Sequence, residues 1–196
     1  NNFKTDIIMS DIMVDIETLA TTPEAVVITI GAIRFDPFAD DRESFEGDKI
    51  IMDTFYRRID PESFTWPSAH IDDNTLAWWG KQAPEVQHEA FTDEDRHPIQ
   101  EVMKDFYRWC GGYDNMWANG PAFDIVILEE VCKQLKRGAP WKYWQVKDTR
   151  TVYGLVHHDR PNPRLHHAAW DCWSQIVALQ SCFRNLNITQ YPEREK

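Results

Sequence analysis

The chain has 196 residues, which is the size of one ordinary α/β domain that can bury a core without disulfides. Hydrophobic residues make up 42% of it and aromatic residues 13%, which excludes a disordered chain. No apolar run approaches the roughly 18 residues of a membrane span, so no membrane association is expected.

The net charge of −11 argues against a conventional nucleic-acid-binding protein, because a polyanion is normally bound by a basic surface. An acidic protein can still act on a nucleic acid when its carboxylates hold divalent cations, since the cations then carry the positive charge. The four cysteines form no CxxC pair. This favours reduced, buried thiols in a cytosolic protein over disulfides or a zinc site.

The first third of the chain predicts three strands. DIMVDIET at 11–18 alternates apolar and polar residues, and 25–35 and 53–59 have a similar character. The polar, turn-rich segment between the second and third strands predicts a hairpin loop. Three strands in succession indicate an antiparallel start to a sheet.

The rest of the chain alternates helices and short strands. It predicts helices at 72–82 and 98–112, a strand at 115–119, an amphipathic helix at 123–138, a strand near 141–146 and a short helix at 149–156. A final helix is predicted from about Ala168 to Asn185, with a buried stripe of Cys172, Ile176, Leu179 and Phe183. This order predicts a single α/β domain over residues 1–196, with a mixed central sheet flanked by helices and with flexible ends.

Two acids lie in the first predicted strand. Asp15 and Glu17 are two residues apart, so both point to the same face of a strand. Neighbouring carboxylates in apolar surroundings repel each other unless a cation lies between them. The alternative is a pair of acids at a frayed strand end.

Two further acids stand at helix starts. Asp124 follows the loop Asn119–Gly120–Pro121, and Asp171 lies in the first turn of the final helix. Each by itself is readily explained as a cap or a partner of the helix dipole. Together with Asp15 and Glu17 they are four carboxylates from three segments, which is the oxygen ligand set that two hard divalent cations require.

These three motifs, in this order, resemble those of the DEDD superfamily of 3′→5′ exonucleases, with its DnaQ-like (RNase H-like) fold, in the histidine-bearing subgroup. The segments IETLATTPEAVVITIGAIRFDP, LAWWGKQ and KDTRTVYGL strengthen the resemblance, which covers nearly the whole chain. It is similar above all to the T-even-phage exodeoxyribonuclease type and its bacterial exoribonuclease-like relatives. The family often has a second acid where this chain has Trp170.

Either of two adjacent histidines is a candidate general base. A helix turns about 100° per residue, so His167 would share a face with Asp171 if the helix already covered both histidines. The family spacing instead places the base five residues before the aspartate, in the preceding loop, and the prolines of PNPRL favour a non-helical approach. We therefore assign His166 as the general base, because an imidazole exchanges protons near neutral pH.

The resemblance implies that Asp15, Glu17, Asp124 and Asp171 hold two divalent cations, Mg²⁺ or Mn²⁺. It implies that terminal phosphodiesters are hydrolysed to nucleoside 5′-monophosphates, with Glu17 also meeting the terminal 3′-hydroxyl. Substrate contacts are expected from Thr18 and Leu19, from Asn119 of the second motif, and from Trp78, whose ring can stack on a base. Trp78 and Trp79 can equally divide into one core ring and one surface ring.

The resemblance to the phage type favours the 3′ end of single-stranded DNA as the partner. RNA is the runner-up, because the contacts to the 2′-hydroxyl that distinguish the two are not visible in motif spacing. A non-catalytic nucleic-acid-binding module is the remote alternative, since no acid is missing. Arg150 and Lys147 are candidates for phosphate contacts or ordinary solvated charges. Many relatives dimerise, and a homodimer stays open here. The expected location is the cytoplasm, that of the host if the chain is phage-encoded.

Overall fold

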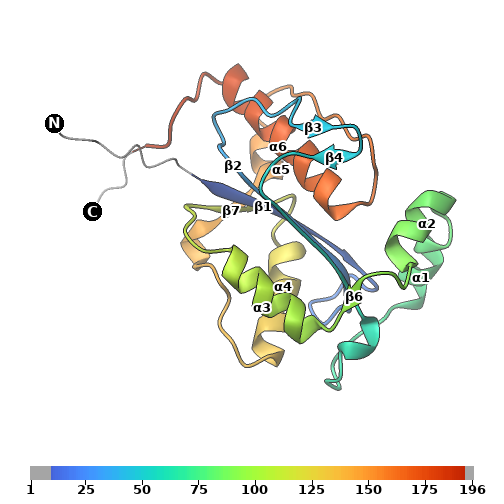
Figure 1. The fold of residues 1–196 in the computed structure, drawn as a ribbon. Helices are drawn as coiled ribbons and strands as arrows, with labels where there is room; N and C mark the ends of the chain where they lie inside the picture. The colour runs from blue at the N-terminus through green and yellow to red at the C-terminus, as the bar shows by residue number, and fades with distance from the viewer. Residues whose placement is uncertain (1–9, 193–196) are drawn as a thin grey trace.

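The structure, a computed structural model, describes residues 10–192 (Figure 1). Its centre is a six-stranded sheet in the order β6-β5-β2-β1-β7-β8. Strand β2 pairs antiparallel with both β1 and β5, whereas β1–β7, β7–β8 and β5–β6 are parallel. The strands are β1 (Asp11–Thr18), β2 (Val27–Phe35), β5 (Thr54–Ile59), β6 (Arg96–His97), β7 (Met116–Ala118) and β8 (Val146–Asp148).

Helices cover both faces of this sheet. Figure 1 shows α5 and α6 on one face and α3 and α4 on the other. The helices are α1 (Asp73–Trp79), α2 (Pro84–Phe91), α3 (Ile99–Trp109), α4 (Asp124–Gln134), α5 (Thr149–Tyr153) and α6 (Ala168–Asn185), with short 3₁₀ turns at Pro61–Ser63 and Tyr143–Gln145. A small hairpin, β3 (Phe45–Glu46) and β4 (Lys49–Ile50), lies outside the main sheet.

Successive side chains of β1 point to opposite faces of the sheet, so they contribute to two hydrophobic clusters. Ile12, Val14 and Ile16 belong to the core that includes α3 and α4, whereas Met13 packs with residues of α6. Asp15 and Glu17 follow Met13 at steps of two and therefore face the α6 side. The strand pattern thus places the two acids under the helix that carries Asp171.

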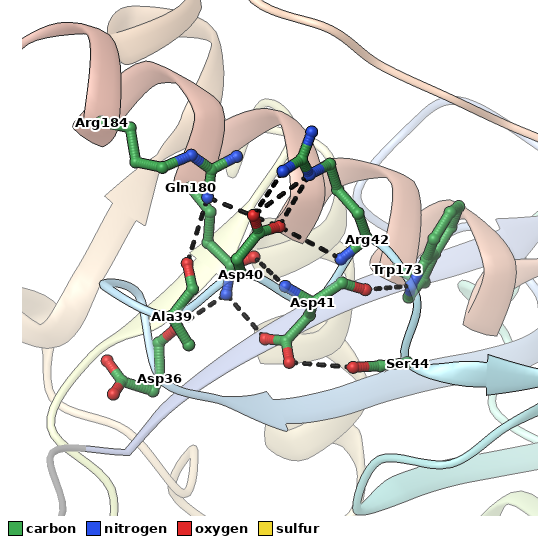
Figure 2. A network of polar contacts seen from close by, with 9 residues as sticks. All are labelled: Asp36, Ala39, Asp40, Asp41, Arg42, Ser44, Trp173, Gln180 and Arg184. Atoms are coloured by element: carbon green, nitrogen blue, oxygen red, sulfur yellow. Dashed lines mark hydrogen bonds and ion pairs between the residues drawn. The ribbon is translucent and has the colours of Figure 1, made fainter.

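Helix α6 is buried around nearly its whole circumference, so the predicted four-residue stripe is too narrow, although all four of its members are buried. The reason is the loop 36–44, which lies across the helix (Figure 2). The buried amide of Gln180 donates to the Asp36 carbonyl (2.8 Å) and to Asp41 Oδ2 (2.7 Å), and it accepts from the Asp41 N–H (3.0 Å). Trp173 Nε1 donates to the Asp41 carbonyl (3.0 Å).

The start of α6 lies directly against β2 because Gly31 has no side chain. A Cβ at Gly31 would lie 2.4 Å from the carbonyl carbon of Ala168 and 2.6 Å from the backbone nitrogen of Ala169. Gly31 is also the cross-strand partner of Asp15. This glycine therefore brings the first turn of α6, with Asp171, close to the acids of β1.

Most predicted elements are confirmed to within a few residues, and the mixed α/β class is confirmed. The strand predicted near 141–146 is wrong in position: Tyr143–Gln145 form a 3₁₀ turn, and β8 follows at Val146–Asp148. The predicted loop between the second and third strands contains the hairpin β3–β4, and the helix α2 and the strand β6 were not predicted. All four cysteines are buried and free. Within residues 10–192 no helix is long and apolar enough to cross a membrane. The predicted flexibility of the ends concerns residues that lie largely outside this described range.

Candidate active site

Three of the predicted acids meet at one point. Oxygens of Asp15 and Glu17 on β1 and of Asp171 on α6 all lie within 4.8 Å of one another. Two amides orient this cluster. Gln175 Nε2 donates to Asp15 Oδ1 (2.8 Å), and Asn162 Nδ2 donates to Asp171 Oδ1 (2.6 Å).

The fourth acid, Asp124, lies at the start of α4 and lines the same cavity of about 330 Å³ as the other three. Its Oδ1 accepts the backbone N–H of Ile16 (3.2 Å). This bond joins the start of α4 to the middle of β1, between the two acids of the first motif. All four predicted carboxylates are therefore brought to one cavity, although Asp124 is not part of the three-oxygen cluster.

Burial and mutual repulsion disfavour ionisation of these acids. Burial, and then the charges of Asp124, Glu17 and Asp171, raise the pKa of Asp15 well above its ordinary value. Burial, and then Asp171 and Asp124, do the same to the pKa of Glu17. Burial raises the pKa of Asp124 to about 7 and also raises the pKa of Asp171, against the hydrogen bond from Asn162.

The cluster fits divalent cations by its donors as well as by its charge. It offers carboxylate oxygens from three elements, which are the hard ligands that Mg²⁺ and Mn²⁺ prefer. Four acids that repel one another in one cavity are stabilised in their ionised form when cations lie between them. The residues that would hold divalent metal are therefore Asp15, Glu17, Asp124 and Asp171.

The structure separates the two histidines. His166 has a left-handed backbone (φ 57°) just before α6, and it lines the cavity of the acids. Its ring packs edge-on against Trp78 and Trp79, with centroids 4.9 and 6.1 Å away. His167 is the N-cap residue of α6, and its ring is turned away onto Tyr56 (4.6 Å). The loop position expected for His166 is found, and His167 does not line this cavity.

A second cavity of about 570 Å³ adjoins the first, since Ile16, Glu17 and Phe123 line both. The exposed ring of Trp78 lines it, whereas Trp79 beneath is buried, so the pair divides into one surface ring and one core ring. Its other lining residues are Thr18, Thr21, Asp72, Asn74, Thr75 and Trp79. The structure thus forms a cavity lined by aromatic rings beside the acids.

The remaining predicted residues fall in different places. Asn119 lines the cavity of the acids, where its Oδ1 accepts from the Thr149 hydroxyl (3.2 Å). Leu19 is buried in the core and lines neither cavity. Trp170 packs edge-on against Phe45 and Trp173, with ring centroids 5.7 and 5.5 Å away, and also lies outside both cavities.

The structure adds residues that the sequence analysis missed. Gln175 and Asn162 bind the acids, and Arg160 lines their cavity. Gln175 follows Asp171 by four residues, and on a helix that spacing places both on one face, so this signal was present. Asn162 and Arg160 lie in an irregular loop, where no periodicity indicates a direction.

The comparisons with known proteins agree with this geometry. The family model of the Rv2179c-like 3′-5′ exoribonuclease domain matches residues 10–183. An exodeoxyribonuclease of Enterobacteria phage T4 is 27% identical over 210 residues, which cover 95% of this chain and 90% of the phage protein.

Solved structures of E. coli exonuclease I share the fold. Its complex with a dA16 oligonucleotide has a TM-score of 0.63 at 12% identity, and its zinc-bound complex with single-stranded DNA has 0.62 at 13%. These matches cover 90% and 91% of this chain but only 41% of exonuclease I, so the chain spans about two fifths of that protein. By the family match over most of its length, the chain belongs to the Rv2179c-like 3′-5′ exoribonuclease domain family and is a 3′→5′ exonuclease.

Proposed function

We propose that this exonuclease shortens single-stranded DNA from its 3′ end, releases nucleoside 5′-monophosphates, and depends on two divalent cations, Mg²⁺ or Mn²⁺. The observation that carries the proposal is the aromatic cavity that shares Glu17 with the cavity of the acids. A base in this cavity places the terminal linkage of the strand beside the acids. The base is bound by stacking on an aromatic ring, an interaction that tolerates any sequence.

Asp15, Glu17, Asp124 and Asp171 would hold the cations. When bound, such cations supply Lewis acidity to the phosphodiester and lower the pKa of water. The protein provides the fixed positions of these acids, through Gln175 on Asp15 and Asn162 on Asp171. Without that support the repelling acids would move apart.

His166 is the proposed general base. It lines the cavity of the acids, and its ring is held against Trp78 from the side (4.9 Å). An imidazole nitrogen there can accept the proton of the attacking water. Glu17 borders both cavities, so it is also the acid placed to meet the 3′-hydroxyl of the terminal sugar.

Two arginines complete the site with positive charge. Arg150 and Arg160 line the cavity of the acids. A Cβ at Gly120 would lie 3.2 Å from the Arg150 guanidinium carbon, so this glycine makes room for the side chain. The Arg160 guanidinium lies 5.9 Å from the Tyr153 ring. We expect both to contact phosphate oxygens of the strand, since guanidinium matches phosphate in geometry and charge.

DNA is favoured over RNA by the phage T4 relative, which is an exodeoxyribonuclease similar over 90% of its length. The family description, which names exoribonuclease, makes RNA the second candidate. The discriminating assay compares kcat/KM on 5′-labelled DNA and RNA of one sequence with a third oligonucleotide, DNA that ends in a single ribonucleotide.

We expect DNA to be degraded fastest. Slow degradation of the DNA that ends in a ribonucleotide would show that the enzyme discriminates at the terminal 2′-hydroxyl. Faster degradation of RNA would overturn the choice of DNA. We expect His166→Ala to reduce cleavage of every substrate to a small residual rate, and unchanged cleavage would overturn the assignment of the base.

A further inference from the structure

The residue after the proposed base has a site of its own. His167 is mostly buried, and its ring stacks on Tyr56 of β5 with centroids 4.6 Å apart and planes 18° apart. It makes no side-chain capping bond at the start of α6, and its buried Nδ1 has no hydrogen-bond partner within residues 10–192. The ring is therefore held by stacking rather than by hydrogen bonds.

A carboxylate of α2 lies close to both rings of this stack. Glu89 Oε1 accepts from the Tyr56 hydroxyl and from Arg58 Nη2 (2.6 Å), and it lies 3.9 Å from His167 Nε2. Burial lowers the pKa of His167, which favours the neutral ring. Burial opposes ionisation of Glu89, but the bonds from Tyr56 and Arg58 lower its pKa. The carboxylate thus holds Tyr56 in place under a neutral imidazole.

The two histidines point to opposite sides because of the backbone between them. His166 is left-handed (φ 57°), whereas His167 is extended (φ −119°, ψ 104°). A left-handed conformation is unfavourable for a residue with a side chain, so neighbouring contacts must hold it. On one side His166 contacts Trp78, and on the other side the adjacent residue is fixed on Tyr56.

We infer that the stack of His167 on Tyr56, held by Glu89, is the element that positions His166 in the cavity of the acids. His167 is in this view a positioning residue that acts through its neighbour. The inference rests on the proposed function, because it takes His166 as the general base. It also assigns a role to α2, which contributes Glu89 to this stack from outside the cavity of the acids.

The test is a double-mutant cycle measured in single turnover on 5′-labelled single-stranded DNA. We expect His167→Ala to lower the maximal rate of cleavage about tenfold or more, with the half-saturating enzyme concentration changed less than about twofold. His167→Phe keeps a stacking ring and is expected to retain most of the rate. Tyr56→Ala should resemble His167→Ala, and Tyr56→Phe should be much milder.

The cycle separates positioning from a general structural effect. If His167 acts only through His166, adding His167→Ala to His166→Ala leaves the residual rate unchanged. His97→Ala is the matched control, because it removes another histidine–carboxylate contact, with Asp95 (3.1 Å), away from both cavities. Thermal unfolding and Mn²⁺ titration show that each variant is folded and that the acids still bind metal.

Two results would overturn the inference. One is a full additional loss of rate when His167→Ala is combined with His166→Ala. The other is equal damage by His167→Phe and His167→Ala in folded protein. Failure of the proposed function is distinguishable from both, because it would show as wild-type cleavage by His166→Ala alone.

Discussion

Replacing Asp124 by asparagine should stabilise the metal-free protein while abolishing its activity. Burial raises the pKa of this acid from 3.8 to about 7, which means that the fold opposes its ionisation. Asparagine has nearly the same shape and keeps an oxygen for the Ile16 N–H bond (3.2 Å), but it carries no charge. The substitution therefore removes the electrostatic cost and retains the hydrogen bond.

The size of the effect follows from the pKa shift. Each pKa unit corresponds to about 1.4 kcal/mol, so the raised pKa of Asp124 lowers the free energy of unfolding by about 4 kcal/mol at about pH 8, where the acid is ionised in the folded state. At about pH 5.5, where the folded state keeps the acid protonated, the loss is about 2 kcal/mol. The pKa of the folded state lies above that of the unfolded state. At pH values between these two pKa values the folded state therefore binds more protons than the unfolded state, and the stability of wild type falls as the pH rises through this range.

Thermal unfolding in EDTA at the two pH values measures the effect. We expect Asp124→Asn to unfold roughly 8–16 °C above wild type at the higher pH, with about half that gain at the lower pH. Mn²⁺ should stabilise wild type more than the variant, because the cation offsets the repulsion among the acids. A variant no more stable than wild type at the higher pH in EDTA would refute this account of the site's electrostatics.

Three further substitutions test other parts of the structure. Gly31→Ala places a Cβ 2.4 Å from Ala168, so it should destabilise the fold by about 2 kcal/mol or more and lower activity, as denaturant unfolding and a cleavage assay would show. Asp11→Ala should cost about 3 kcal/mol or more, because it leaves the buried Trp117 Nε1 without its acceptor (2.7 Å). Trp78→Ala should raise KM for single strands by about tenfold with a smaller effect on kcat; an unchanged KM would exclude base stacking on this ring.

The directions of the acids on β1 and α6 could be predicted because local periodicity determines them. The two-residue step between Asp15 and Glu17 places them on one face of β1, and Asp171 lies on the first turn of α6, which begins where the sequence indicated. These are short-range properties of the chain. Helix periodicity alone favours His167, so the loop position of His166 followed from the spacing in the family that the chain resembles, together with the prolines before it.

The support of the site could not be predicted, because it depends on contacts between distant segments. Glu89 lies on α2, which has weak amphipathic character and no side-chain cap at its start, and it meets Tyr56 of β5 only in the folded protein. The close approach at Gly31 likewise depends on a helix that follows it by more than a hundred residues. A glycine inside a strand pattern indicates a close contact but not its partner.

We expect the four acids to form the active site of this 3′→5′ exonuclease. A time course on 5′-labelled single-stranded DNA with Mn²⁺ tests this most directly, with wild type and Asp15→Asn compared side by side. With wild type we expect a labelled ladder that shortens one nucleotide at a time from the 3′ end, and with Asp15→Asn an intact strand. Early release of the 5′ label as a mononucleotide, or equal cleavage by the two proteins, would contradict it.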